Sequence, residues 1–477
     1  VGAVTAGLTY LAARPRVGRA GALVAGGLVA LSGPLIYFEG ELLLVVLEAP
    51  LFLLTAWSLD VAWRERRPSC WLWAGAWLGL SALVRPITLA LVPVVVPVLL
   101  VRRRRGGIRA AILYVVGASL LVSPVLVRNW VVGKDLVPVA SQGGLNYYLG
   151  NNPNADGRAA LAPEFRQTWF GGLEDSRWQA EQAMGRSLKP SEISAYWGGL
   201  ALSWAREHPG DWLRLQVRKL AYFWDAFEIP NNQDYTYFSR LARIYRIPLL
   251  LGFGVLAPLA VAGWWVGARR RSLSWVWWTV PLVLMAVIVA FFVCGRFRAS
   301  LIPVFAVGAG ALVPWCLALW RERRWRSLAI AAALLAGVSV FANGDWFGQR
   351  RAWSPAESLL RIGVHQAAAG NLEAAADSYE RALRARPGFA DGWNNLGVVR
   401  AEQGLRDDAY AAFTRALETD PTHAKAAANL AKLLAESGDA ERATSLARQV
   451  LEAAHSEAAS LKTAATLQIG RASCRER

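Results

Sequence analysis

Charged residues are scarce in this sequence: of its 477 residues, 18% are charged and 55% are hydrophobic. Soluble proteins carry about 25% charged residues, so the composition excludes a chain that is soluble throughout. Cysteine and histidine are also rare, with four of each. Cys70, Cys294, Cys316 and Cys474 have no spacing typical of a disulfide framework or a metal site. All four histidines lie outside the apolar runs, which argues against a histidine-based centre within a membrane.

The charge that is present is mostly positive. Lysine and arginine number 52 against 35 acidic residues, which gives a net charge of +17. No nucleic-acid-reading motif accompanies this charge, so we do not expect a nucleic-acid partner. The arginines instead form short clusters between apolar runs, which is the positive-inside pattern of membrane proteins.

Ten apolar runs predict spans of a membrane, because a helix needs about 20 apolar residues to cross the hydrocarbon core. The runs cover residues 1–12, 20–36, 43–59, 70–84, 87–101, 110–127, 247–268, 273–294, 300–320 and 327–342. The sequence therefore predicts an all-α, polytopic transmembrane bundle in segments 1–127 and 247–342. The first run begins at Val1 without a methionine, so we expect a truncated chain. Residues 469–477 resemble a translated sequencing adapter and are set aside.

Arginine clusters follow every second run, which predicts the orientation of the bundle. They comprise Arg14, Arg16 and Arg19; Arg64, Arg66 and Arg67; residues 102–105; residues 269–271; and Arg321, Arg323, Arg324 and Arg326. Because basic loops remain in the cytoplasm, one alternation fits all ten runs. It puts a loop domain at residues 128–246, and everything after about residue 342, outside the cytoplasm.

Within this loop domain, residues 207–227 have the pattern of an amphipathic helix. Its apolar residues recur at steps of three and four, with basic residues elsewhere: Leu213, Val217, Leu220, Phe223 and Trp224 against Arg214, Arg218 and Lys219. Two interpretations stay open. The helix packs on the core of the loop domain, or it lies on the membrane surface.

The C-terminal part repeats every 34 residues, as Gly370, Gly404 and Gly438 show. The second unit matches the tetratricopeptide pattern at Trp393, Leu396, Gly397, Ala409, Phe413, Ala416 and Pro421. Three units are expected over residues 356–457. Such an array forms an α-solenoid whose usual role is to bind a protein partner rather than to perform chemistry.

Acidic residues near membrane depth are candidates for chemistry, because a charge there is costly and usually functional. Glu39 and Glu41 stand two residues apart where the second run ends, and they could act as a general base or hold a cation. The alternative is that both are solvated loop residues. Glu48 lies inside the third run, where it is either functional or a structural carboxylate.

Four arginines on the predicted outer side break the positive-inside trend: Arg85, Arg128, Arg296 and Arg298. Arginine suits bidentate contacts to phosphate, so these residues predict a site for an anionic lipid headgroup. Snorkelling at the interface is the alternative. Segment 128–157 adds amides and aromatics of the kind that recognise sugars, at Asn129, Gln142, Asn146, Tyr147, Asn151 and Asn152. An ordinary turn-rich loop would have a similar composition.

Three segments together resemble glycosyltransferase family 39 and its relatives, which include protein O-mannosyltransferases and the lipid A aminoarabinose transferase. They are SALVRPITLAL, RNWVVGKDLVPVASQGGLNYYLGNNP and GRFRASLIPVFAVGAGAL. The resemblance covers about residues 1–342 and implies an enzyme of the bacterial plasma membrane. It implies a polyprenyl-phosphate sugar donor, a protein or glycolipid acceptor outside the cytoplasm, and inversion at the anomeric carbon.

The resemblance also assigns roles. Glu39 and Glu41 would line the site or help to hold a divalent metal ion, whose use stays open. The four arginines would contact the lipid phosphate, and the amide-rich segment would cover the cavity. The family's main base lies in a loop that would precede Val1, so we expect the fragment alone to be inactive. An O-antigen polymerase or ligase, a non-enzymatic repeat scaffold and a transporter are the alternatives.

Overall fold

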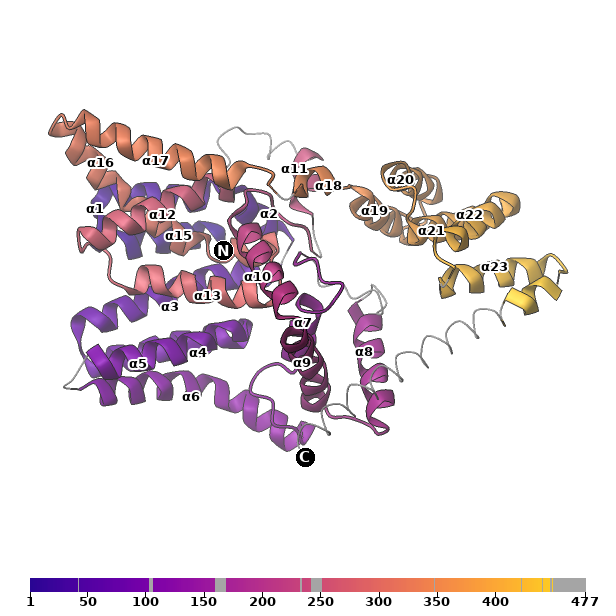
Figure 1. Cartoon of the computed structure of the whole chain (residues 1–477), viewed down its shortest axis with the longest axis horizontal. Helices are drawn as coiled ribbons and strands as arrows, with labels where there is room; N and C mark the ends of the chain where they lie inside the picture. The colour runs from indigo at the N-terminus through magenta and orange to yellow at the C-terminus, as the bar shows by residue number, and fades with distance from the viewer. Residues whose placement is uncertain are drawn as a thin grey trace. The chain divides into compact units, whose positions relative to one another are not determined.

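The computed structural model describes residues 1–41, 43–102, 106–158, 169–231, 234–241, 251–346, 348–421, 423–439, 441–446 and 448. Within these residues the chain forms helices and no strand, which confirms the predicted all-α class (Figure 1). The chain divides into two compact units. The larger comprises residues 1–181 and 186–347, and the smaller comprises residues 182–185 and 348–477.

The larger unit is a helical bundle. Its helices are α1 (Gly2–Ala30), α2 (Gly33–Gly40), α3 (Val45–Glu65), α4 (Pro68–Val84), η1 (Pro86–Leu91), α5 (Val92–Arg102), α6 (Gly107–Gly133), α12 (Phe253–Arg269), α13 (Val276–Phe291), α14 (Gly295–Ala299), α15 (Ile302–Gly310), α16 (Leu312–Arg321) and α17 (Trp325–Asn343). Helices α3 and α6, the stretch Ile302–Arg321 and helix α17 are long and apolar enough to cross a membrane. Shorter apolar helices accompany them at residues 68–84, 86–102, 253–269 and 276–291.

Helix α1 is two helices joined at Gly18, whose backbone is left-handed with φ 71°. The two halves pack against each other, because a Cβ on Gly26 would lie 3.1 Å from the Ala6 carbonyl oxygen. The predicted run 20–36 does not form one helix. Ser32 caps the N-terminus of α2 through its side chain, and Pro34 follows at a position that suits the first turn.

Glycine lets some bundle helices approach closely, as is common in membranes. A Cβ on Gly75 of α4 would lie 1.9 Å from the Tyr114 carbonyl oxygen of α6. A Cβ on Gly117 of α6 would lie 2.1 Å from the carbonyl oxygen of Leu72. Side chains larger than hydrogen therefore do not fit at this helix crossing.

Three of the basic connections meet at one end of the bundle, which we call the basic end (left in Figure 1). Asp60 of α3 is fully buried there and pairs with Arg16, whose Nε lies 2.6 Å from the carboxylate. The Ser274 hydroxyl donates to the same carboxylate at 2.6 Å, and Arg64 donates to the Ser272 carbonyl oxygen at 3.2 Å. The side of the membrane that this end faces stays a prediction.

Segment 128–246 contributes further helices, which belong to the same unit except for residues 182–184 of α8: α7 (Gly143–Gly150), α8 (Trp169–Met184), α9 (Pro190–Glu207), α10 (Pro209–Trp224) and α11 (Tyr235–Leu241). The GGLNYYLG stretch forms helix α7 rather than the expected turns. Two of its glycines allow close backbone contact, since a Cβ on Gly144 would lie 1.7 Å from the Ser194 carbonyl oxygen of α9. A Cβ on Gly150 would lie 1.9 Å from the Phe291 carbonyl oxygen of α13.

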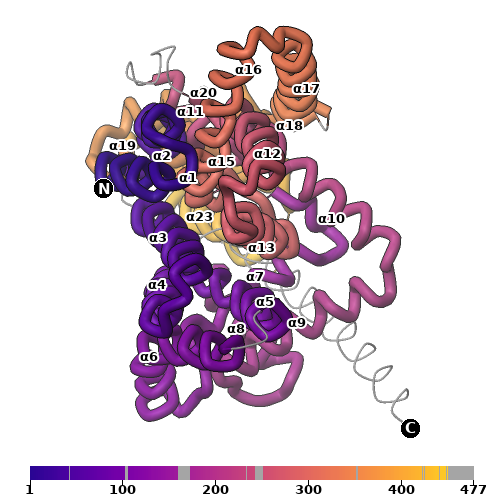
Figure 2. The backbone as a smooth tube through the Cα atoms, turned by 90° about the vertical axis from the view of Figure 1, so that its left-hand side faces the viewer, coloured from indigo at the N-terminus to yellow at the C-terminus, as the bar shows by residue number. Residues whose placement is uncertain are grey.

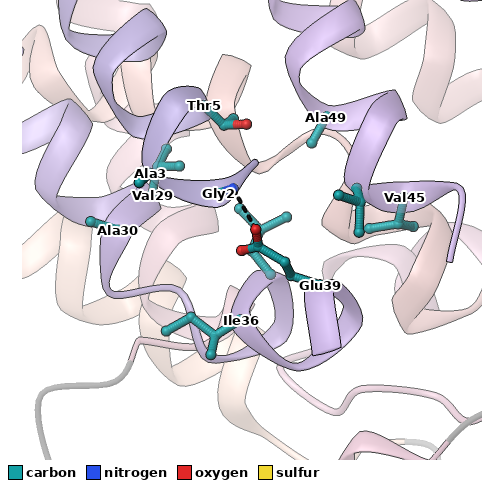
Figure 3. Close-up of a pocket in the computed structure, with 11 residues that line it drawn as sticks. Gly2, Ala3, Thr5, Val29, Ala30, Ile36, Glu39, Val45 and Ala49 are labelled. Carbon is teal, nitrogen blue, oxygen red and sulfur yellow. Dashed lines mark hydrogen bonds between the residues drawn. The ribbon is translucent and has the colours of Figure 1, made fainter. Parts of the chain in front are cut away.

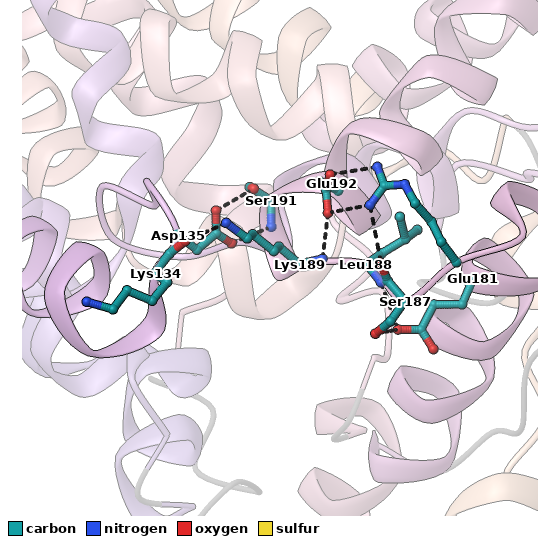
Figure 4. A network of polar contacts seen from close by, with 9 residues as sticks. Lys134, Asp135, Glu181, Ser187, Leu188, Lys189, Ser191 and Glu192 are labelled. Atoms are coloured by element: carbon teal, nitrogen blue, oxygen red, sulfur yellow. Dashed lines mark hydrogen bonds and ion pairs between the residues drawn. The ribbon is translucent and has the colours of Figure 1, made fainter.

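A polar network fastens the start of α9 to the turn that follows α6 (Figure 4). The Ser191 hydroxyl and amide donate to the Asp135 carboxylate at 2.5 and 2.8 Å. Lys189 donates from Nζ to the Lys134 carbonyl oxygen at 2.8 Å, and Arg186 pairs with Glu192 at 2.7 Å. The arginine partner and the Lys189 amide hold the pKa of Glu192 down to about 2.

The smaller unit contains the repeats as α19 (Ala356–Ala368), α20 (Leu372–Ala385), α21 (Ala390–Glu402), α22 (Arg406–Thr419) and α23 (Ala424–Glu436), after the short helix α18 (Gln349–Ala352). The three glycines of the 34-residue period have φ of 79°, 82° and 86°, so each supplies the left-handed turn between paired helices. Gly397 of α21 lies against the ring of Phe413 of α22. The repeat prediction is confirmed for the described units, while Ala447 of the third unit lies outside them.

Candidate functional site

Glu48 and Arg85 come together at the end of the bundle opposite the basic end. Arg85 follows α4 and Glu48 lies in the first turn of α3. The distance from Arg85 Nη2 to Glu48 Oε1 is 2.5 Å, and the Glu48 side chain is completely buried. Glu48 is therefore the ion-pair partner of Arg85. The sequence indicates a special role for Glu48 only by its position inside an apolar run.

Phe297 of α14 joins Arg85 to Arg296. The Arg85 guanidinium carbon lies 4.4 Å from the centroid of the Phe297 ring, and that of Arg296 lies 5.1 Å from it. Both arginines have a buried Nε that meets no hydrogen-bond acceptor among the described residues. We call Glu48, Arg85, Arg296 and Phe297 the Arg85 cluster. Its formal charge is +1, and its unpaired donors suit an anion.

Glu39 lies in α2, which contacts both α3 and α14. Its Oε1 accepts a hydrogen bond from the Gly2 amide at 2.7 Å (Figure 3). The same oxygen accepts a bond from the Val1 ammonium at 2.8 Å, and the Gly2 and Val1 bonds together lower the pKa of Glu39. Glu39 also lines a cavity of about 270 Å³ whose other walls are mainly aliphatic, including Ile36 and Val45. Glu41 ends α2 and is half-buried.

The surroundings of Arg298 do not fit the predicted phosphate contact. Its side chain is completely buried. Its Nη1 donates to the carbonyl oxygens of Tyr222, Phe223 and Asp225, and its Nη2 donates to that of Phe227 and to the Glu228 carboxylate. Arg298 therefore binds the C-terminal carbonyls of α10, where a cation is favourable. Both terminal nitrogens are used within the protein, so we assign it a structural role.

Arg128 and Asn129 lie near the end of α6. Arg128 is exposed and donates to the amide oxygen of Asn129 at 3.1 Å. The Asn129 amide donates to the Val137 carbonyl oxygen at 2.9 Å and closes the turn after the helix. The structure does not bring Arg128 into an ion pair or ring contact with the Arg85 cluster, within the part of the chain that it describes.

The asparagines after α7 are buried and bonded to protein groups, contrary to a sugar-facing role. The Asn151 amide donates to the Tyr147 and Ala290 carbonyl oxygens at 2.9 and 2.8 Å. Asn152 donates to the Tyr148 carbonyl oxygen at 2.9 Å. Both side chains thus bind carbonyl groups near the C-terminus of α7, and Asn151 also connects this helix to α13. Gln142, Asn146 and Tyr147 are half-buried, with Tyr147 against the Phe291 ring at 5.6 Å.

The sequence pattern sets Lys219 apart from the apolar positions of α10, but the residue is completely buried. Its Nζ donates to the Asn151 side-chain oxygen at 3.0 Å. Burial lowers its pKa from 10.5 to about 7. Phe297 was also missed, because nothing in the sequence separates it from the many aromatic residues of the apolar runs.

Among the residues that the structure describes, no group of three or more His, Cys, Asp or Glu side chains could hold a metal ion.

Two parts of the chain are similar to known families. A family model described as dolichyl-phosphate-mannose-protein mannosyltransferase matches residues 1–128, which include Glu39, Glu48 and Arg85. A tetratricopeptide repeat model matches residues 400–465. No curated protein matches the chain. Residues 1–128 are thus similar to protein mannosyltransferases, and the C-terminal part is similar to tetratricopeptide repeats.

Proposed function

We propose that the protein transfers a sugar from a polyprenyl-phosphate donor to an acceptor outside the cytoplasm, and that the Arg85 cluster binds the donor phosphate. The family match supports sugar transfer in general. The donor class is supported chiefly by one observation: Arg85 and Arg296 flank Phe297 with buried Nε donors that meet no acceptor among the described residues.

In the proposed reaction the acceptor oxygen forms a bond to the anomeric carbon while the bond to the phosphate oxygen breaks. The bonding electrons leave with the polyprenyl phosphate, and a base takes the proton of the acceptor hydroxyl. Attack from the face opposite the leaving group gives inversion. Arg85 and Arg296 would stabilise the negative charge that develops on the leaving phosphate. Glu48 would fix the position of Arg85 through its ion pair.

Glu39 and Glu41 are proposed to line the acceptor side of the site. The Glu39 carboxylate would accept a hydrogen bond from an acceptor hydroxyl or bind a cation. The repeats supply a module of a type that binds proteins. A protein acceptor or an assembly partner is therefore the proposed ligand of the repeats.

Binding of a fluorescent polyprenyl phosphate to the full chain in nanodiscs tests the site without requiring turnover. Arg85→Ala and Arg296→Ala should each weaken binding at least tenfold, which corresponds to about 1.4 kcal/mol. Arg269→Ala is the matched control, because Arg269 also stacks on an aromatic ring, that of Trp265 at 4.5 Å, but lies at the end of α12 near the basic end.

Equal binding by the wild type and both cluster variants would refute the proposed phosphate site. Absence of binding by the wild-type chain, under conditions in which it is folded, would favour the non-enzymatic scaffold instead.

A further inference from the structure

Helix α10 exposes an apolar stripe on the side that faces away from the protein. Leu213 and Val217 each keep 58% of their surface exposed, and Leu220 keeps 41%. At 100° per residue these positions fall within an arc of about 60°, so they form one continuous stripe. We call them the α10 stripe. These three side chains therefore do not pack on the protein, whereas Phe223 of the same apolar pattern is completely buried.

The opposite face of α10 attaches it to the ends of two apolar helices. Lys219 Nζ lies 3.5 Å from the Ala290 carbonyl oxygen, at the end of α13. The Phe223 ring lies 5.8 Å from that of Phe253, the first residue of α12. These helix ends are opposite the basic end. Because α12 and α13 are apolar helices of the bundle, α10 is held at the level where such helices leave a membrane.

The axis of α10 crosses the direction of the bundle helices. Figure 1 shows the bundle from the side, with α10 transverse to α12 and α13. Figure 2 looks along the bundle and shows α10 extending outward beside it. A helix that is transverse to membrane-crossing helices lies along the membrane plane.

Two exposed arginines border the α10 stripe. Arg214 is 80% exposed at its side chain and forms a surface ion pair with Asp211 at 3.2 Å. Arg218 follows one turn later and is also exposed. An apolar stripe with arginines beside it is the pattern of helices that lie in the interface and contact anionic headgroups.

We infer that α10 is an interfacial helix whose stripe inserts among the lipids at this end of the bundle, with Arg214 and Arg218 binding the phosphates of anionic lipids. Lipid is favoured over a protein partner because the same helix is fixed to the ends of two apolar bundle helices. This inference does not rest on the proposed transfer reaction.

The test places a fluorescent label at V217C, in full-length protein whose native cysteines are replaced by serine. The exposed position should tolerate the label. The protein is reconstituted in phosphatidylcholine nanodiscs with or without phosphatidylglycerol. Quenching is measured with a lipid that carries its quencher near the headgroup and with iodide in solution. I330C on the exposed face of α17 is the membrane control, and N154C in an exposed turn is the aqueous control.

V217C should be quenched by the shallow lipid at least twofold more than N154C, and phosphatidylglycerol should increase this quenching. R214Q/R218Q should abolish the increase while retaining quenching in phosphatidylcholine. If V217C behaves like N154C, the stripe faces water and the inference fails. It also fails if the label is shielded from both quenchers, because a protein surface or a second copy then covers the stripe.

Discussion

Glu48 and Arg85 form an ion pair of 2.5 Å in which the Glu48 side chain is completely buried and the Arg85 side chain is 16% exposed. Removal of one partner from a buried pair leaves an uncompensated charge and costs about 3–5 kcal/mol. Replacement of both partners removes that cost. The pair therefore allows the structural and ligand-binding contributions of Arg85 to be separated.

Glu48→Gln alone should lower the thermal unfolding midpoint, because Arg85 then loses its only ion-pair partner in the described structure. The double variant Glu48→Gln/Arg85→Gln should recover most of that midpoint but should not recover binding of polyprenyl phosphate. Circular dichroism of detergent-solubilised protein and the nanodisc binding measurement provide the two readouts. Strictly additive losses of stability in the double variant would show that the two residues do not act as a pair.

Arg296 and Arg298 are two residues apart but should respond differently to substitution. Arg298→Ala leaves several carbonyl oxygens and Glu228 without their buried donor, so it should reduce the yield of folded protein and its resistance to trypsin. Arg296→Ala should leave both nearly unchanged and weaken only ligand binding. Normal folding of Arg298→Ala would contradict the structural role that its contacts assign to it.

The all-α class and the repeats could be predicted because their signals are local. A span is a run of about 20 apolar residues, and the repeat is a spacing of 34 that recurs along the sequence. The break near Ser32 was missed because the apolar character continues across it. Only the cap by Ser32 and the following proline mark the start of α2.

The roles of single polar residues could not be predicted, because their partners are distant in the sequence. Arg298 binds carbonyl groups more than 70 residues earlier, and Asn151 reaches Ala290, which is 139 residues away. Composition shows that such residues can bind phosphate or sugar. It does not show whether a backbone carbonyl already uses their donors.

Lys219 should make stability depend on pH. Its pKa is about 7 in the folded protein and 10.5 without burial. Between these values the unfolded state binds more protons, so stability should rise with pH, by up to about 1.4 kcal/mol per unit. Lys219→Met should be more stable than the wild type at pH 7, and its advantage should shrink towards pH 10.

Thermal unfolding of both proteins between pH 7 and 10 checks this expectation, with Arg218→Met as an exposed control on the same helix. An advantage of Lys219→Met that stays constant over this range would mean that Lys219 is charged in the folded state.

The orientation of the bundle can be tested with reporters. An alkaline phosphatase fused after Ala342 should be active, because that enzyme matures only outside the cytoplasm and the arginine alternation puts this position there. A fusion at Arg271, in the basic connection between α12 and α13, should be inactive. The reverse pattern would invert the topology and move the Arg85 cluster to the cytoplasmic side.

Gly397 should be intolerant of even a methyl group. A Cβ there would lie 2.6 Å from Cε1 of Phe413, which is itself almost completely buried. Gly397→Ala should therefore destabilise the repeats by about 1–3 kcal/mol through overpacking. Faster amide hydrogen exchange in α21 and α22 of the full chain would report this loss of stability. Gly388→Ala is the control, because a methyl group on Gly388 would meet no atom within 4 Å among the described residues.

A smaller side chain in place of Phe413 should restore part of the stability that Gly397→Ala removes. The third unit has alanine at both equivalent positions, Ala431 and Ala447, so the sequence itself offers a pair in which both partners are small. In Gly397→Ala/Phe413→Leu, the amide hydrogens of α21 and α22 should exchange more slowly than the sum of the effects of the two single substitutions predicts. Additive effects would show that the contact between Gly397 and Phe413 does not set the distance between these helices.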